Sequence, residues 1–136
     1  MIHVICYISN SIVDISNQDI HEIFEITLQN NKKRNITGIL IYNNGHFFQV
    51  LEGKESDVEY VYSRIIEDYR HHGIIKLLET KIKDSIFAEY ETGFTVMKDF
   101  SRIRKLKIYF DWIKEANYKK ANELVNLANN FIKNSQ

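Results

Sequence analysis

Two amide side chains interrupt faces that the sequence pattern otherwise fills with apolar residues. Gln49 lies among bulky apolar residues in a predicted strand, 46–53, and Asn31 ends the apolar stripe of a predicted helix, 16–31. Leaving a buried amide without hydrogen bonds costs about 1–3 kcal/mol. Both positions therefore predict a hydrogen-bond partner, and a ligand rich in carbonyl and ring-nitrogen groups is one such partner.

A tyrosine of the predicted first strand is the third candidate. Tyr7 belongs to strand 2–9, whose period of two places it on the same face as Ile5. Tyr7 and Gln49 can reach one pocket if their strands pair in a suitable register. Each residue also has a simpler interpretation: Tyr7 as a core residue, Asn31 as a helix C-terminal residue, and Gln49 as a polar strand residue.

The elements that must position these residues follow the order β-α-β-β-α-β-β. The predicted strands cover residues 2–9, 36–43, 46–53, 74–83 and 91–97, and the predicted helices cover residues 16–31 and 56–71. Ser16 with Asp19 predicts the start of the first helix, and Ser56 with Glu59 predicts a capping box for the second. Asn43-Asn44-Gly45 predicts a tight hairpin turn. This order is typical of an α+β, ferredoxin-like fold with two helices on one face of a mostly antiparallel sheet.

A flat ligand could fit between those two helices, above the central strands, where Asn31 would line the cleft. The second helix is predicted to turn Val58, Val61, Ile65 and Tyr69 inward. The other face of the sheet needs a cover, and two amphipathic patterns in the tail provide it. These patterns consist of Phe100, Ile103, Leu106, Phe110 and Ile113, then Leu124, Leu127 or Ala128, and Phe131. No proline or low-complexity linker separates the tail, so residues 1–97 and the helical cap 98–136 are predicted to form one domain.

Composition excludes several classes of function. The 136 residues carry 18 basic and 18 acidic side chains, and this balance argues against a nucleic-acid partner. No run approaches the roughly 20 apolar residues of a membrane span, and the N-terminus does not resemble a signal peptide. The expectation is therefore a cytoplasmic protein without a membrane partner. Cys6 is the only cysteine, which excludes an internal disulfide and a multi-cysteine zinc site.

The sequence contains none of the common catalytic motifs. Its five glycines are scattered and form no phosphate-binding loop, and no nucleophile-elbow spacing is present. The adjacent pair His71-His72 is a poor metal site because neighbouring helical residues point about 100° apart. The predictions are accordingly no enzyme and no metal centre.

Three segments together resemble a known family. They are Asn30-Asn31, Ile36-Thr37-Gly38-Ile39-Leu40 and Phe47-Phe48-Gln49-Val50-Leu51-Glu52-Gly53. These segments resemble the BLUF family of blue-light sensors that use flavin, and the resemblance extends over roughly residues 2–97. It implies noncovalent binding of FAD between the two helices of a ferredoxin-like core. It also implies that Tyr7 donates an electron to the photoexcited flavin, and that Gln49 bridges Tyr7 and the ring.

The resemblance assigns further residues to the cofactor. Asn31, with Asn30 beside it, would hydrogen-bond the carbonyl region of the ring. A series at the end of the second helix resembles the family pattern and comprises Arg64, Asp68, Arg70 and His71. Arg70 and His71 would approach the ring or ribityl chain, and Arg64 could meet phosphate. The alternative is a solvated helix end, where basic residues suit the helix dipole.

The resemblance weakens at the last strand. Tyr90 stands where the family usually has tryptophan, Thr92 where it has methionine, and Ser85 where it has arginine. Tyr90 and Thr92 are thus the positions implied for signal relay, and Thr92 could hydrogen-bond Gln49 directly. These departures affect the expected output route more than the flavin site.

The expected function is a short blue-light photoreceptor whose output is a change in self-association or in a partner protein. Short family members commonly form oligomers, so the resemblance implies a homo-oligomer, with the tail helices as the natural contact surface. Two alternatives remain. One is a light-insensitive ferredoxin-like binding module whose flavin site has decayed, and the other is a flavin enzyme, which needs substrate access to the ring.

Overall fold

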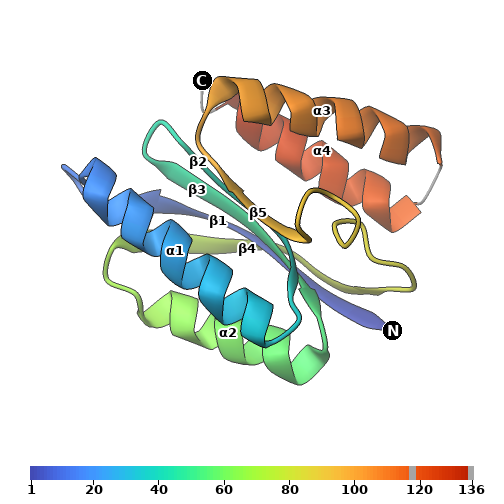
Figure 1. Ribbon diagram of the computed structural model, residues 1–136, viewed down its shortest axis with the longest axis horizontal. Coiled ribbons are helices and arrows are strands. Elements are labelled where there is room, and N and C mark those ends of the chain that lie inside the picture. The colour runs from blue at the N-terminus through green and yellow to red at the C-terminus, as the bar shows by residue number, and fades with distance from the viewer. Residues whose placement is uncertain (117–118, 135–136) are drawn as a thin grey trace.

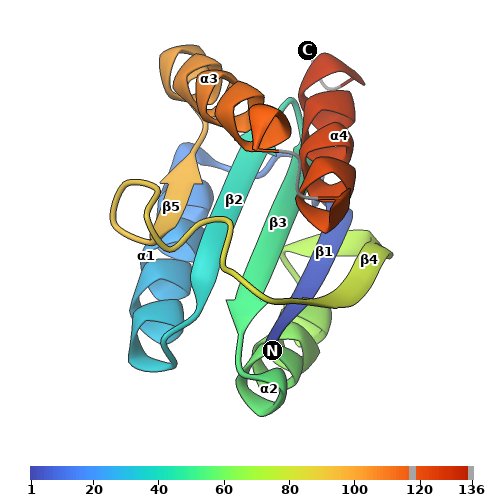
Figure 2. The same ribbon diagram turned by 90° about the vertical axis from the view of Figure 1, so that its right-hand side faces the viewer.

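A five-stranded sheet with helices on both faces forms the molecule, and the computed structural model describes residues 1–116 and 119–134 (Figure 1). The elements are β1 (Ile2–Ser11), α1 (Asn17–Lys33), β2 (Thr37–Asn43), β3 (His46–Gly53), α2 (Glu55–Glu67), β4 (His71–Ile82), β5 (Phe94–Met97), α3 (Phe100–Glu115) and α4 (Lys119–Asn134). Helices α1 and α2 cover one sheet face, and α3 and α4 cover the other (Figure 2). The predicted α+β architecture with its two helical layers is confirmed.

The strands follow the order β4-β1-β3-β2-β5 across the sheet. Strand β1 is antiparallel to β3 and β4, β2 is antiparallel to β3, and only β5 runs parallel to its neighbour, β2. The register places Tyr7 opposite Gln49, Gln49 opposite Leu40, and Leu40 opposite Val96. One row of side chains therefore crosses β1, β3, β2 and β5 beneath α1 and α2, as the period-two pattern of Tyr7 requires.

Two hydrophobic clusters stabilise the two faces. The inner cluster, under α1 and α2, is built from Ile5, Ile20, Ile36, Leu40, Phe47, Leu51, Val58, Val61 and Phe94. The outer cluster joins Val4, Cys6, Phe48 and Val50 of the central strands to Ile103, Leu106 and Phe110 of α3 and to Leu124, Val125 and Ala128 of α4. The tail helices therefore share one core with the sheet. Among the described residues, no helix is both long and apolar enough to cross a membrane.

The two predicted helix starts have different outcomes. Ser16 is the N-cap of α1, and a reciprocal capping box links it to Asp19, as predicted. The box predicted at Ser56 is wrong, because α2 already begins at Glu55 and its N-cap, Lys54, makes no side-chain cap bond. Strand β3 ends at Gly53, so a single residue separates strand from helix, and Ser56 is already helical.

Helix α2 is shorter than its sequence pattern predicts. It ends at Glu67, and Asp68 is extended with φ −74° and ψ 116°, so the helical period stops before Tyr69. Tyr69, predicted to face inward, is 82% exposed. Phe100 is likewise exposed rather than buried, because it opens α3 at the edge of the layer, with the Arg104 guanidinium 4.9 Å from its ring centroid.

The connection from β4 to β5, residues 83–93, is a loop that a buried carboxylate holds in place. Glu52 is 0% exposed on β3 and accepts bonds from four donors. They are Thr37 Oγ1 at 2.7 Å, Ser85 Oγ at 2.7 Å, the Ile86 amide at 2.7 Å and the Phe87 amide at 3.1 Å. Tyr109 of α3 donates its hydroxyl proton to the Ile86 carbonyl from the other side. The loop is thus pinned between the sheet and α3, and β5 begins only at Phe94 instead of residue 91.

Candidate flavin site

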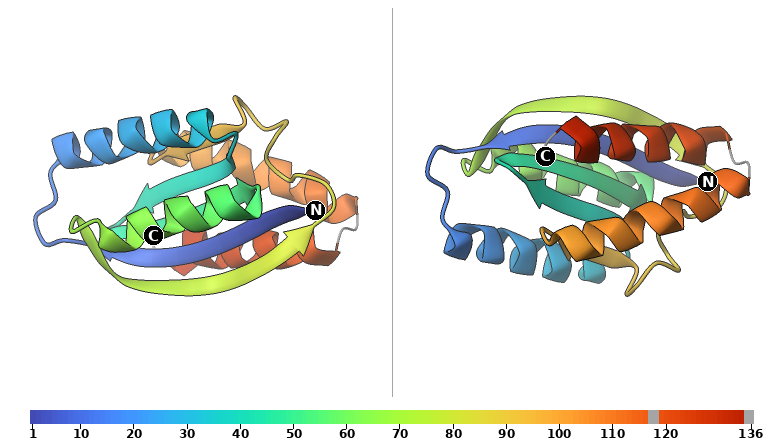
Figure 3. Two further views of the ribbon diagram at one scale, coloured as in Figure 1. Left: turned by 90° about the horizontal axis from the view of Figure 1, so that it is seen from below. Right: turned by 90° about the horizontal axis from the view of Figure 1, so that it is seen from above.

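A hollow of about 350 Å³, which includes space open to solvent, lies on the sheet face that α1 and α2 cover. Figure 3 shows the two helices lying along this face, with the strands behind them. The lining residues are Ile23 and Thr27 of α1, Ile65 of α2, Tyr7, Leu40, Phe47 and Gln49 of the sheet, and Asp68 and His71 of the segment that enters β4. Mostly apolar walls with a few convergent polar groups are typical of a small-molecule site.

A hydrogen bond between Tyr7 and Gln49 forms the floor of this hollow. The Tyr7 hydroxyl donates to Gln49 Oε1, and both side chains are buried. Burial raises the pKa of the Tyr7 phenol well above its ordinary value, so the hydroxyl stays protonated and remains a donor. Gln49 Nε2 has no partner among the described residues. The amide thus engages Tyr7 with its oxygen and keeps two N–H donors unused beside the hollow.

Asn31 presents a second unused amide. Its side chain is 1% exposed near the end of α1, and Nδ2 has no partner within the described chain. Its backbone carbonyl accepts bonds from the Arg34 and Ile36 amides, which end the helix and start the turn into β2. Asn31 does not line the hollow directly, and Asn30 is exposed. A ligand with carbonyl acceptors, as a flavin ring has, fits the two orphaned donors of Gln49 and Asn31.

The segment after α2 holds a histidine in a fixed orientation. His71 Nε2 lies 2.7 Å from the Ile65 carbonyl, and Nδ1 lies 2.8 Å from the Ser9 hydroxyl. Because a carbonyl only accepts, Nε2 carries the proton in this bond, while Nδ1 faces the Ser9 hydroxyl. The His71 ring is 6.4 Å from Tyr7 and 6.0 Å from Phe47 between centroids, so it packs against the floor of the hollow.

Asp68 and Arg70 form a closed pair at the mouth of the same segment. Arg70 donates from Nε to Oδ1 at 3.0 Å, from Nη2 to Oδ2 at 2.7 Å, and from its backbone amide to Oδ1 at 2.9 Å. Asp68 lines the hollow, whereas Arg70 does not. The guanidinium is thus committed to Asp68. Burial raises the pKa of the Asp68 carboxyl, but the Arg70 bonds outweigh burial and hold it below its ordinary value.

The Arg70→Gln variant should lose stability in a pH-dependent way. Because the Asp68 pKa is lower in the folded protein than in the unfolded chain, the pair stabilises the protein above about pH 4 and ceases to do so as pH falls through the folded pKa. Urea unfolding should show a loss of about 1 kcal/mol at pH 7 that nearly vanishes at about pH 2. Arg64→Gln is the control, since its exposed pair should contribute almost nothing. A loss of equal size at both pH values would contradict this assignment.

Three other predicted residues lie away from the hollow. Arg64 is exposed on the last turn of α2, and its Nη1 lies 3.8 Å from Glu67 Oε2. Tyr90 packs on the outer cluster with its ring 4.7 Å from that of Tyr109. Thr92 is exposed, and its hydroxyl donates to the Phe94 carbonyl at 3.1 Å instead of to Gln49. The predicted Thr92–Gln49 bond is therefore absent.

The late start of β5 explains this difference. Thr92 lies in the turn before the strand, and the β5 residue in the row of Gln49 is Val96, with Leu40 between them. Val96 packs against the inner cluster, so it is the β5 side chain nearest in register to the site. Sequence reasoning missed Val96, although its alternation with Met97 carries the signal.

Sequence reasoning also gave no site role to much of the lining, although it placed Thr27 or Leu28 on the inward stripe of the first helix. Ile23 and Thr27 lie one turn apart on α1, and their spacing of four is the signal that both face one side. Leu40 and Phe47 belong to the recognised segments but were given no role. Ser9, which orients His71, shares the face of Tyr7.

Comparison with known protein families shows to which family this chain belongs. The profile of the family described as "BLUF: Sensors of blue-light using FAD" matches residues 2–93. This chain belongs to the BLUF family. The family consists of blue-light sensors that bind flavin, in agreement with the predicted resemblance.

Individual BLUF proteins show the extent of the likeness. The blue light- and temperature-regulated antirepressor BluF of Escherichia coli (strain K12) is 44% identical over 59 residues, which are 43% of this chain and 15% of BluF. Photoactivated adenylate cyclase subunit alpha of Euglena gracilis is 33% identical over 81 residues, which are 60% of this chain and 8% of that protein. The chain thus corresponds to a small part of these curated relatives.

A solved BLUF domain has the same fold. The structure titled "BlrP1 BLUF" superposes with a TM-score of 0.63 at 31% identity and covers 72% of this chain and 65% of that one. A solved BLUF domain thus shares its fold with most of this chain.

Proposed function

We propose that this chain is a blue-light photoreceptor that binds FAD noncovalently beside Tyr7 and Gln49 and signals by rearranging their hydrogen bond. The observation that carries the proposal is the buried Tyr7–Gln49 bond at the floor of the hollow, together with the unused Gln49 amide nitrogen. Membership in the BLUF family supports it. FAD, rather than another flavin, rests on the printed description of that family.

Tyr7 and Gln49 have complementary parts in this switch. The flavin, when bound, supplies the absorption of blue light and an acceptor for one electron. Tyr7 is the electron donor, and a tyrosine that loses an electron also releases its phenolic proton. Gln49 Oε1 is the acceptor already positioned at that proton. Rotation or tautomerisation of the Gln49 amide then changes which of its groups faces Tyr7 and which faces the hollow.

The remaining residues hold and shield the cofactor. Asn31 offers its amide nitrogen to a ring carbonyl, and the His71 ring packs against Tyr7 and Phe47. The apolar lining of α1, α2 and β2 excludes water, which strengthens the hydrogen bonds inside. The Asp68–Arg70 ion pair holds the chain in place just before His71. Asn30 and Arg64 are exposed, so any contact they make lies with the solvent-facing parts of FAD.

We further infer that residues 1–97 are the sensor core and that 98–136 form a cap of the same domain that carries the output. Glu52 lies three residues after Gln49 on β3 and holds the Ile86 amide, and the Ile86 carbonyl accepts the Tyr109 hydroxyl of α3. This chain of contacts supports a route from the light-sensing strand to the cap. Tyr90 packs on Tyr109 and belongs to that route, whereas Thr92 contributes only to the turn.

The proposed output acts in the cytoplasm on a partner protein or on a homo-oligomer of this chain. An antirepressor and an adenylate cyclase subunit are among the named relatives, so light sensing is coupled to different effectors within the family. The second candidate is a light-insensitive binding module with a decayed flavin site. It is favoured by one observation, namely that among the described residues neither Tyr90 nor Thr92 hydrogen-bonds Gln49.

The visible spectrum of the purified protein, in the dark and after blue light, separates these functions. We expect a yellow protein whose flavin absorption shifts slightly to the red after illumination and returns in darkness. A bound flavin whose spectrum stays fixed or only bleaches would overturn the photoreceptor. A colourless protein, even after reconstitution with FAD, would favour the light-insensitive module.

A further inference from the structure

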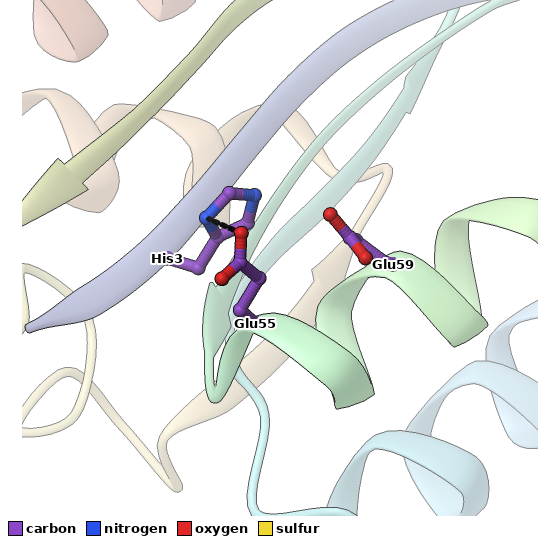
Figure 4. Close-up of side chains that lie close together, drawn as sticks. All are labelled: His3, Glu55 and Glu59. Carbon is purple, nitrogen blue, oxygen red and sulfur yellow. Dashed lines mark ion pairs between the residues drawn. The ribbon is translucent and has the colours of Figure 1, made fainter.

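A second cluster of chemically active side chains lies at the far end of β1 from the turn into α1. His3 of β1 faces Glu55 and Glu59, which lie on successive turns of α2 (Figure 4). One potential ligand atom from each of the three residues lies within 4.8 Å of the other two. His3 Nδ1 is 3.9 Å from Glu55 Oε1. None of these residues lines the hollow that holds Tyr7 and Gln49. We call this group the His3 cluster.

The histidine of this cluster is buried and preoriented. His3 is 5% exposed, and its Nε2 lies 2.7 Å from Glu79 Oε2 on β4. Because an ionised carboxylate only accepts, Nε2 carries the proton in this bond. When the ring is neutral, its lone pair is on Nδ1, the nitrogen that faces Glu55. Nδ1 has no hydrogen-bond partner among the described residues.

This arrangement has the features of a metal-binding histidine. A metal-ligating imidazole usually donates its other N–H to a carboxylate, which sets the tautomer and makes the free nitrogen more basic. Glu79 is suited to that task, because its Oε2 lies 2.7 Å from His3 Nε2 and its Oε1 accepts from Lys76 Nζ at 2.6 Å, so both carboxylate oxygens are held in place. A buried nitrogen without a partner also costs free energy, which a bound cation would recover.

The two glutamates complete a three-ligand set. Residues four apart on a helix share one face, so Glu55 and Glu59 project towards the same point. Donors around a tetrahedral zinc ion lie about 3.3–3.6 Å apart, since Zn–N and Zn–O bonds are about 2.0–2.2 Å long. The ligand atoms lie within 4.8 Å of one another, so the glutamate ends must close by up to about 1.5 Å, and both glutamates are exposed enough to move.

We propose that His3, Glu55 and Glu59 bind one divalent transition-metal ion of the zinc class, with Glu79 as the supporting carboxylate. An imidazole nitrogen favours zinc over magnesium or calcium, which prefer oxygen ligands alone. Water would complete the coordination on the exposed side. The bound ion would connect the start of β1 to the first turn of α2, and so join two elements that also contribute Tyr7 and Ile65 to the hollow.

Titration of the metal-free chain with ZnCl2, monitored by isothermal titration calorimetry, tests this assignment. We expect one saturable equivalent that is absent when MgCl2 replaces ZnCl2. The double variant E55Q/E59Q should weaken zinc binding at least 30-fold, since it removes two anionic ligands at exposed positions without disturbing the core. E79Q should weaken binding about tenfold through loss of the supporting carboxylate. E67Q, on the exposed end of the same helix, is the matched control and should bind as the natural chain does.

Two results would overturn the proposal. One is that the natural chain takes up no zinc in a saturable way. The other is that the natural chain and E55Q/E59Q bind zinc with equal affinity. The latter would place the ion at other histidines, such as the exposed His21 or His72. Because a His3 variant could simply misfold, the glutamate variants carry the test. Their unfolding temperatures without metal should match that of E67Q, while only E67Q and the natural chain should gain stability when zinc is added.

Discussion

Tyr7→Phe is expected to abolish the light-induced red shift while the protein keeps its flavin. The substitution removes only the hydroxyl that donates to Gln49 Oε1, and the phenyl ring still fills the floor of the hollow. Without that hydroxyl, the chain loses its positioned donor of both electron and proton. Difference absorption spectroscopy before and after blue light should therefore show no reversible shift in the variant, at a flavin content close to that of the natural chain.

Tyr62→Phe provides the matched control for this experiment. Tyr62 lies on α2 with its ring centroid 5.8 Å from that of Tyr7, so it is the neighbouring phenol that could act as an alternative donor. Tyr62 does not line the hollow, and the control variant should keep a normal red shift. A normal shift in Tyr7→Phe, or its loss in Tyr62→Phe alone, would show that the donor has been assigned to the wrong tyrosine.

Glu52→Gln is expected to cost about 2–3 kcal/mol of unfolding free energy despite its nearly identical shape. All four groups around the Glu52 carboxylate are donors, and the site is completely buried. An amide must turn its NH2 group towards at least one of them. If the amide oxygen takes the place of Oε1, the NH2 group takes the place of Oε2. Two buried N–H donors, the new NH2 group and the Ile86 amide, then face each other without an acceptor. Chemical denaturation monitored by circular dichroism measures the loss.

Ser85→Ala is the control for the Glu52 variant. It removes one of the donors to Oε1 and leaves the carboxylate with three, so it should cost only about 1 kcal/mol. Amide hydrogen exchange offers a local readout, since Ile86 should lose protection in Glu52→Gln but keep it in Ser85→Ala. Equal losses in the two variants would mean that the charge of Glu52 does not hold the 83–93 loop.

The floor of the site could be predicted because periodicity decides which face a residue occupies. Alternation along β1 places Tyr7 on the inner face, and the apolar stripe of α1 places Asn31 at a buried position. Gln49 was recognised because an amide is conspicuous in that pattern. The hairpin turn at Asn44-Gly45 was predictable for a similar local reason: both residues adopt positive φ, which asparagine and glycine tolerate.

The end of α2 could not be predicted, because the helical pattern continues past the residue where the helix stops. Arg70 bonds the Asp68 carboxylate and draws the chain into β4, so Tyr69 faces solvent instead of the core. Whether these residues continue the helix or enter the strand depends on the pairing between β4 and β1. These strands are far apart in the sequence, so no short segment contains this information. The same reason applies to Thr92, whose distance from Gln49 follows from where β5 joins β2.

By itself, the sequence determined the order of the elements, the face of each strand residue, and the family resemblance that predicted a flavin site. These properties arise from local periodicity and from short contiguous segments. Only the tertiary structure decided that Tyr7 lies opposite Gln49, that Glu52 collects four donors, and that His3 meets Glu55 and Glu59. Each of these contacts joins residues at least 15 apart along the chain, and their distances depend on strand register and helix placement, which the packing of the whole chain sets.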